Sequence, residues 1–164
     1  MSEEAAGALG TSLLFDVFAL GQSVGRLLSE AMRDGPLTPS EYAVYSAIFE
    51  LEAATPTQLA ARLGMRLTTC MDQLRAVEVR GHAARLPHPT DGRSYRVVLT
   101  TAGREAHRAA NRGFEAADHA FRSLLPRGEA AAKADLQAIR DAAEAARRDL
   151  GAELSPRPRA GRAG

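Results

Sequence analysis

A group of polar side chains near the middle of the sequence has the residue types and spacing needed to bind nucleic acid. Thr68, Thr69 and Gln73 follow one another at helical spacing and can exchange hydrogen bonds with base edges or phosphates. Arg66 and Arg75 lie beside them and can neutralise phosphate. These five side chains predict a helix that contacts duplex DNA.

Asp72 lies on the same predicted face and is its unexpected member. A carboxylate can accept a hydrogen bond from the N4 amino group of cytosine. It can equally orient a neighbouring arginine. The sequence leaves both interpretations open.

Charge is unevenly distributed along the chain. The whole sequence has a net charge of +1, but the segment from Thr55 to Arg104 has eight bases and three acids, a net charge of +5. The bases are Arg62, Arg66, Arg75, Arg80, Arg85, Arg93, Arg96 and Arg104, and the acids are Asp72, Glu78 and Asp91. A basic centre within an acidic remainder is expected where only the centre contacts phosphate.

Other function classes find no support in the sequence. Cysteine and histidine never cluster at zinc-binding spacing, so we expect no metal and no other cofactor. The single cysteine, Cys70, is predicted to be a small buried hydrophobe. Because no phosphate-binding loop, nucleophile elbow or catalytic carboxylate pair is present, we do not expect an enzyme. No secretory signal or long apolar run is present either, so we expect a cytoplasmic protein without membrane contact.

The contacting helix is the second of a predicted helix-turn-helix. Two capping boxes, at Thr38–Glu41 and Thr55–Gln58, each place proline at the first helical position and open the helices that precede it. The first of these runs to about Glu52 and the second ends at Gly64. The next helix begins at Leu67, and its predicted inward face consists of Leu67, Cys70, Met71, Leu74 and Val77.

A two-stranded ribbon is predicted to follow, because the apolar period changes to two after Gly81. Ser94–Leu99 alternates in this way, Ala84–Leu86 is its expected antiparallel partner, and residues 87–92 form the turn. Arg93 and Asp91 lie near the tip of this ribbon and Arg96 lies on its second strand.

Long amphipathic helices flank this unit. One is expected from Leu9 to Arg33 and a second from Thr100 or Thr101 to about Leu125. A third follows the interruption at Pro126-Arg127-Gly128 and runs to about Leu150. Their apolar stripes are too long for so small a domain to bury, so we expect a homodimer. The fold is therefore predicted to be mostly α with a small antiparallel β wing. The expected regions are a flexible N-terminus (1–8), dimerisation helices (9–36 and 101–150), a winged helix-turn-helix (37–100) and a disordered basic tail (151–164).

This order of elements resembles the multiple-antibiotic-resistance regulator (MarR) family of winged-helix repressors. The resemblance covers about Leu9 to Leu150. It is most specific at the wing, where Asp91-Gly92-Arg93 matches the Asp-x-Arg tip of the family and Leu99-Thr100-Thr101-Ala102-Gly103 matches its Leu-Thr-x-x-Gly motif. The resemblance implies a dimeric, ligand-responsive bacterial repressor that places its recognition helix in the major groove of a palindromic operator. It also implies that Arg93 enters the minor groove, held by Asp91.

The resemblance further implies a small aromatic or phenolic effector between the dimerisation helices and the DNA-reading unit. The matching walls offer four aromatic side chains, with Arg26 and His107 as polar anchors; the aromatic residues are Phe15, Phe18, Tyr42 and Tyr45. The alternative is a winged-helix protein-interaction module or a structural dimer that has no effector.

Overall fold

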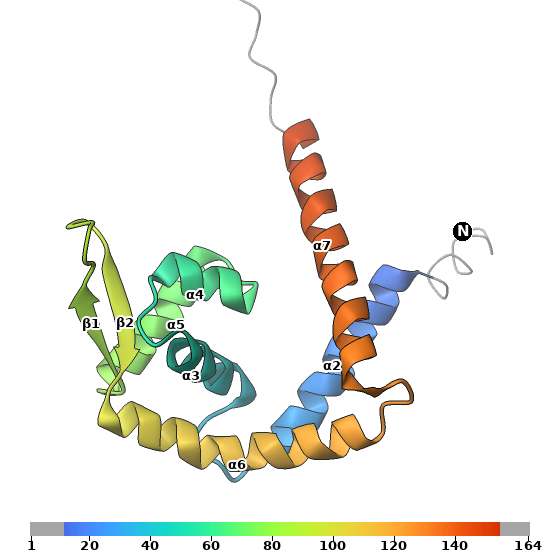
Figure 1. Cartoon of the computed structure of the whole chain (residues 1–164), viewed down its shortest axis with the longest axis horizontal. Helices are drawn as coiled ribbons and strands as arrows, with labels where there is room; N and C mark the ends of the chain where they lie inside the picture. The colour runs from blue at the N-terminus through green and yellow to red at the C-terminus, as the bar shows by residue number, and fades with distance from the viewer. Residues whose placement is uncertain (1–11, 155–164) are drawn as a thin grey trace, which may run out of the picture. The chain divides into compact units, whose positions relative to one another are not determined.

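The structure, a computed structural model, describes residues 12–154. In order these form α2 (Leu13–Ala31), α3 (Pro39–Leu51), α4 (Pro56–Leu63), α5 (Leu67–Val79), β1 (Ala83–Pro87), β2 (Tyr95–Leu99), α6 (Thr101–Ser123) and α7 (Gly128–Leu154) (Figure 1). The predicted class, mostly α with a small antiparallel β wing, is confirmed. One compact unit ends at Asp118 and a second begins at His119. The predicted flexible N-terminus (1–8) and the tail from Ser155 onward lie outside the described residues.

Both predicted capping boxes are present. The Thr38 amide donates to the Glu41 carboxylate at 2.8 Å, and the Glu41 amide donates back to Thr38 Oγ1 at 3.3 Å. Thr55 and Gln58 repeat this exchange at 2.9 and 3.3 Å. Each box provides acceptors for two backbone amides that a helix start leaves unpaired. The α3 and α4 helices therefore begin where the sequence predicts.

The core of the first unit lies where α3, α4, α5 and β2 meet. Its largest fully buried side chains are Tyr45, Ile48, Leu59, Leu74, Val44, Val97 and Cys70. Burial raises the pKa of the Cys70 thiol, and its Sγ lies 3.7 Å from the Pro56 carbonyl oxygen. The interpretation of Cys70 as a buried hydrophobe is confirmed.

The predicted inward face of α5 is wrong at two positions. Cys70, Leu74 and Val77 are buried, but Leu67 and Met71 are 47% and 41% exposed. The neighbouring elements cover only the narrow stripe that the three buried residues form. Met71 lies at the edge of that stripe, where its Sδ accepts a hydrogen bond from the Tyr95 hydroxyl at 3.6 Å.

The ribbon pairs in the predicted antiparallel sense, from Ala83 opposite Leu99 to Pro87 opposite Tyr95. A third segment joins it, because the Val97 amide donates to the Ala54 carbonyl at 2.8 Å. The sequence analysis missed this bridge, since a single residue has no periodicity to reveal it. The bridge ties the ribbon to the segment between α3 and α4.

Residues at the start of α6 fix the base of the ribbon. Thr100 Oγ1 accepts from the Gly103 amide at 3.1 Å and donates to the Gly81 carbonyl at 2.8 Å, so Thr100 caps the helix. A Cβ on Gly103 would lie 2.0 Å from the carbonyl oxygen of His82. Glycine is therefore required by the close approach of α6 to this backbone, which gives the Leu-Thr-x-x-Gly motif a physical reason.

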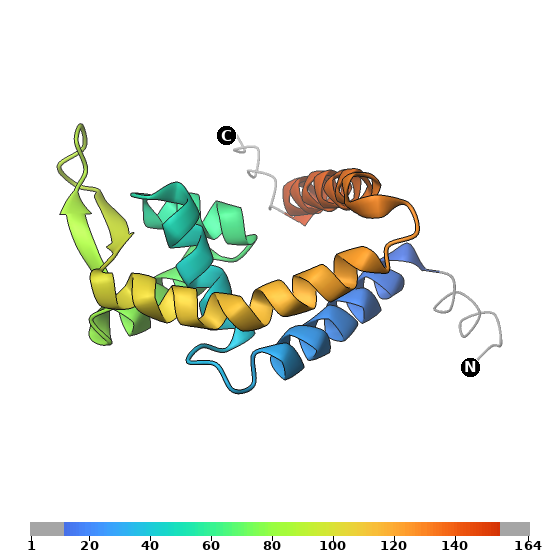
Figure 2. The same cartoon turned by 60° about the horizontal axis from the view of Figure 1, so that its bottom comes forward.

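The α2 helix differs from the core helices, because none of its residues, all of which the structure describes, is buried. It comes close to α6 near its end, where a Cβ on Gly113 would lie 2.6 Å from the Ala31 carbonyl oxygen (Figure 2). None of the helices described combines the length and apolarity needed to cross a membrane.

In the second unit, α7 continues to Leu154 instead of ending near Leu150. The residues predicted as the start of the tail, Gly151–Leu154, contain no proline and prolong the helix. Ion pairs from Arg122 to Glu129 and from Arg127 to Asp135 hold the turn that begins α7. Exposed large side chains remain on this unit at Phe121, Leu124, Leu136 and Leu150.

Candidate nucleic-acid interface

The exposed side of α5 carries most of the predicted contact residues. Thr68, Thr69 and Arg75 are all exposed, and Asp72 is exposed among them. Arg66 is the residue that precedes the first turn of α5, and it makes no side-chain capping bond, so its guanidinium is not used to begin the helix. The structure therefore brings these side chains together on one solvent-facing surface.

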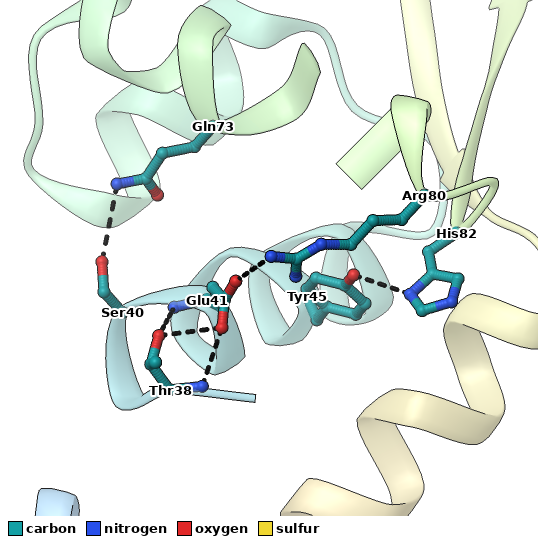
Figure 3. Close-up of polar contacts among 7 residues, drawn as sticks. All are labelled: Thr38, Ser40, Glu41, Tyr45, Gln73, Arg80 and His82. Atoms are coloured by element: carbon teal, nitrogen blue, oxygen red, sulfur yellow. Dashed lines mark hydrogen bonds and ion pairs between the residues drawn. The ribbon is translucent and has the colours of Figure 1, made fainter. Parts of the chain in front are cut away.

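Gln73 lies on the flank of α5 that faces α3. Its Nε2 is 3.5 Å from Ser40 Oγ, and its Oε1 is buried with no hydrogen-bond partner among the described residues (Figure 3). Gln73 is only partly exposed, so contact with a base requires its side chain to leave Ser40.

Four arginines of the basic segment are engaged inside the protein. Arg62 pairs with Glu50 at 2.7 Å, and Arg80 pairs with Glu41 at 2.5 Å. Arg85 makes two bonds to Glu78, at 2.7 and 2.8 Å, and stacks over the Tyr95 ring at 4.3 Å. Arg104 donates to the Leu99 carbonyl at 2.6 Å. These four side chains connect elements of the fold.

The other four arginines form no ion pair within residues 12–154, and they are the four predicted from the sequence to contact DNA: Arg66, Arg75, Arg93 and Arg96. Arg66 directly precedes α5, Arg75 lies on α5, Arg93 at the ribbon tip and Arg96 on β2. Arg96 is partly buried, and its Nε has no hydrogen-bond partner within the part of the chain described. Within the basic segment Thr55–Arg104, the contacts inside the fold thus leave free the arginines at α5 and the ribbon.

Asp91 shapes the ribbon tip through the backbone. Its carboxylate accepts from the Arg93 amide at 3.0 Å, and its carbonyl accepts from the Ser94 amide at 3.0 Å. These bonds fix the turn that presents Arg93, whose own side chain is exposed. Asp91 therefore holds the main chain of Arg93 and leaves the guanidinium free.

A polar network that the sequence analysis missed anchors the end of α5 to α3. Glu41 binds Arg80, and the Tyr45 hydroxyl lies 2.8 Å from His82 Nδ1 (Figure 3). The amide hydrogen bond from Thr38 lowers the pKa of the Glu41 carboxyl, and Arg80 lowers it further. The capping box signals Glu41 in the sequence, but nothing local points to Arg80, because the pair spans distant positions in the chain.

A separate cavity of about 250 Å³ lies between α2, α3, α4 and α6. Its lining includes Leu28, Met32, Tyr42, Ser46, Arg62 and Phe114. Tyr42 stacks on His107 with ring centroids 5.2 Å apart, and His107 Nε2 lies 3.0 Å from Ser46 Oγ. Burial lowers the pKa of His107, which favours the neutral ring. The cavity is thus mostly apolar, with a few polar groups on its walls.

Not all the predicted effector residues meet at this cavity. Tyr42 lines it, and His107 stacks on Tyr42 without being part of the lining. Tyr45 is fully buried and bonds His82 instead. Phe15, Phe18 and Arg26 are exposed on α2, and the α2 segment reaches the cavity through Leu28 and the adjacent Met32. The aromatic residues on α2 were predicted by type, and their direction depends on packing that the sequence does not show.

Comparison with known proteins adds the following. No family model matches the chain. Over 97 residues it is 28% identical to the HTH-type transcriptional regulator TtmR of Methylorubrum extorquens (strain PA1), a match that covers 59% of this chain and 50% of TtmR. The chain therefore matches about half the length of this curated relative.

Three solved structures give the fold over most of the chain. The Streptomyces coelicolor regulator PcaV, solved with its natural ligand, is 22% identical with a TM-score of 0.69, covering 84% of this chain and 96% of PcaV. The repressor CouR, bound to a 23-mer DNA duplex, is 24% identical with a TM-score of 0.68 and the same coverages. The reduced form of Escherichia coli MarR is 25% identical with a TM-score of 0.61, covering 78% and 96%. The predicted resemblance is confirmed, and the fold of this chain is that of the MarR family of winged helix-turn-helix regulators.

Proposed function

We propose that this protein is a dimeric transcriptional regulator that binds a palindromic operator, with α5 in the major groove and the ribbon tip in the minor groove. The observation that carries the proposal is the sorting of the arginines. Within the segment Thr55–Arg104, the four arginines whose side chains bond neither an acid nor a carbonyl of the described structure lie at α5 and the ribbon, where a winged helix-turn-helix meets DNA. A guanidinium on a narrow ribbon also suits the negative potential of an A·T-rich minor groove.

A salt titration of duplex binding tests this function. Bound duplexes are first selected from a random pool, and binding of the preferred duplex is followed by fluorescence anisotropy at increasing salt. We expect the logarithm of the binding constant to fall steeply with the logarithm of salt concentration, because contacts with phosphate release counterions. Absent or salt-independent binding would favour a protein-interaction module or a structural dimer.

The dimer is supported by the uncovered apolar side of α2. Leu13, Leu20 and Leu27 recur at seven-residue spacing and are 61%, 46% and 37% exposed. A helix that meets a second copy of itself buries such a row. Two recognition helices related by a two-fold axis then contact half-sites whose centres are about one turn of DNA, 10 bp, apart.

The effector part of the proposal rests on the cavity that Tyr42 lines, between α2, α3, α4 and α6. Its volume suits a compound of about one ring, and its lining is mostly apolar with a few polar groups. PcaV, whose fold is similar, was solved with its natural ligand. We propose that a small aromatic compound binds here and releases the operator, so that the regulator acts as a repressor.

Calorimetry with and without operator DNA tests the effector. A compound that weakens operator binding must itself bind more weakly by the same factor when the operator is present. A Ser46→Leu variant, which fills the cavity from α3, should lose the compound and keep the operator. If no aromatic compound binds, or if a bound one leaves operator affinity unchanged, the protein is a constitutive DNA-binding protein.

A further inference from the structure

The acids of the basic segment differ in what they bind. Glu78 is paired with Arg85, and Asp91 accepts the Arg93 amide. Asp72 forms no hydrogen bond or ion pair within residues 12–154, although Arg66 and Arg75 belong to the same surface. Orientation of a neighbouring arginine, one of the two roles open from the sequence, is therefore not what this structure shows for Asp72.

Asp72 occupies the middle of the exposed side of α5. At 3.6 residues per turn it lies about 160° around the helix from both Cys70 and Leu74, which form the buried stripe. It lines the groove between α5 and α3, together with Gln73 and Arg80, and also the groove between α5 and the ribbon, together with Arg75 and Arg85. Asp72 therefore lies on the side of α5 that faces away from the core of the unit.

A free carboxylate at this position works against DNA binding in general. It adds negative charge to the surface that approaches the phosphates, and nothing inside the fold compensates it. The cost is recovered only where the DNA itself supplies a hydrogen-bond donor. In the major groove the donors are the N4 amino group of cytosine and the N6 amino group of adenine.

The two donors are not equivalent for a carboxylate. Adenine presents the N7 acceptor directly beside its N6 amino group, so a carboxylate that approaches it also faces an acceptor. Cytosine presents its amino group without a neighbouring acceptor on the same base. Guanine and thymine present acceptors at the matching positions and repel a carboxylate.

We propose that Asp72 is a specificity-determining residue that accepts a hydrogen bond from cytosine N4 at one position of each half-site and disfavours every other base there. The inference rests on the proposed DNA-binding function and deepens it. In this arrangement Asp72 lowers the affinity for DNA of unrelated sequence and restores the affinity at a half-site that has the cytosine. Its effect is therefore to increase the preference for the operator over other DNA.

Selection from a random duplex pool with three full-length proteins tests the inference. These are the wild type, Asp72→Asn, and the control Glu105→Gln, which removes a carboxylate of an exposed residue on α6. We expect the wild type and the control to enrich the same cytosine in each half-site. Because asparagine pairs with adenine through N6 and N7, Asp72→Asn should change the preference at that position from cytosine to adenine.

Affinity measurements on three duplexes complete the test: the selected duplex, a version with the enriched cytosine replaced, and an unrelated duplex. Replacing the enriched cytosine by thymine should weaken wild-type binding about 10-fold, and it should affect Asp72→Ala much less. Binding of Asp72→Ala to an unrelated duplex should be several-fold tighter than that of the wild type. If the wild type, Asp72→Asn and Glu105→Gln select the same bases with the same affinities, Asp72 is an ordinary solvated acid and the inference is wrong. If the wild type enriches no duplex, the proposed function itself fails, and the inference falls with it.

Discussion

The α2 and α3 helices have similar apolar sequences and opposite surroundings. The shorter α3 buries Tyr42, Val44, Tyr45, Ala47 and Ile48, whereas α2 buries nothing. The difference lies in what covers them, because α3 is packed against α4, α5 and β2, and α2 touches the rest of its unit mainly near its end. An amphipathic pattern therefore predicts that a face will be covered, and it does not say by which chain.

Charged side chains also fall into two groups, those paired inside the protein and those without a partner in the described residues. On α3, the Glu41 carboxylate is bonded within the protein to the Thr38 amide, the Thr38 hydroxyl and Arg80. On α5 and the ribbon, four arginines and Asp72 find no charged partner within the described residues. Groups that are satisfied inside the chain should affect stability when they are removed, and groups that face outward should affect binding.

The largest expected effect is on the covered side. Leu74 is buried in the core and Val79 is 81% exposed on the same helix. We expect Leu74→Ala to lower the free energy of unfolding by about 2–5 kcal/mol, because it leaves a cavity as well as losing apolar contacts. Val79→Ala should change it by no more than about 0.5 kcal/mol. Urea unfolding followed by circular dichroism measures both, and equal effects would contradict the assigned faces of α5.

The uncovered side is tested at the centre of the leucine row on α2. Leu20→Asp should raise the dimer dissociation constant at least about 30-fold, the equivalent of about 2 kcal/mol, since it places a charge inside the proposed interface. Ala19→Asp is the matched control, because it adds the same charge on the side of α2 that carries Ser23 and Arg26. Sedimentation velocity over a range of concentrations gives the constant. A wild type that stays monomeric at micromolar concentration would exclude the interface.

Local signals in the sequence predicted the starts of α3 and α4 well, whereas α7 ends beyond its predicted last residue. Thr38 with Glu41 and Thr55 with Gln58 are neighbours in the sequence, so their bonds follow from local geometry alone. The alternation in β2 was equally local. The structure confirms these elements because their determinants lie within a few residues of one another.

Features that depend on distant neighbours were not predicted. Leu67 and Met71 fit the helical period of the inward face, but the width of that face depends on how much of α5 the neighbouring elements cover. The roles of Arg62, Arg80 and Arg85 depend on acids brought close by folding. The four arginines predicted to contact DNA were chosen from the family resemblance and from their position on a helical face. The ion pairs of the other three could not be known from the sequence.

A comparison of two ribbon arginines tests that separation. Arg93→Ala should weaken operator binding by about 1–3 kcal/mol and relax discrimination mainly at the outer base pairs, because Arg93 is free at the tip. Arg85→Ala removes the same charge from a side chain held by Glu78 and Tyr95, and it should change operator affinity by about threefold or less. Anisotropy titrations of both variants at one salt concentration make the comparison. Equal losses of operator affinity would mean that pairing inside the fold does not distinguish the arginines that contact DNA from those that do not.

The smallest expected effect concerns the satisfied carboxylate of α3. Because the pKa of Glu41 is lowered in the folded state, first by the Thr38 amide and then by Arg80, its stabilising contribution is full above the unfolded pKa and is lost as the pH falls through the folded value. Gln can still accept from the Thr38 amide but does not titrate. The free energy of unfolding of the wild type should therefore exceed that of Glu41→Gln by less than about 1 kcal/mol at neutral pH. This difference should shrink as the pH falls below about 4.5.

The variant Arg80→Met ranks the two causes of this pH dependence. Since the Thr38 hydrogen bond is the larger cause, a difference between Arg80→Met and the double variant Arg80→Met/Glu41→Gln should persist and should decline over the same acidic range. Urea unfolding at a series of pH values supplies all four free energies. If the pH-dependent difference disappears once Arg80 is replaced, the ion pair is the dominant interaction of Glu41. In that case Glu41 would be held mainly by a long-range contact that the sequence does not reveal, and the capping box would contribute little to its titration.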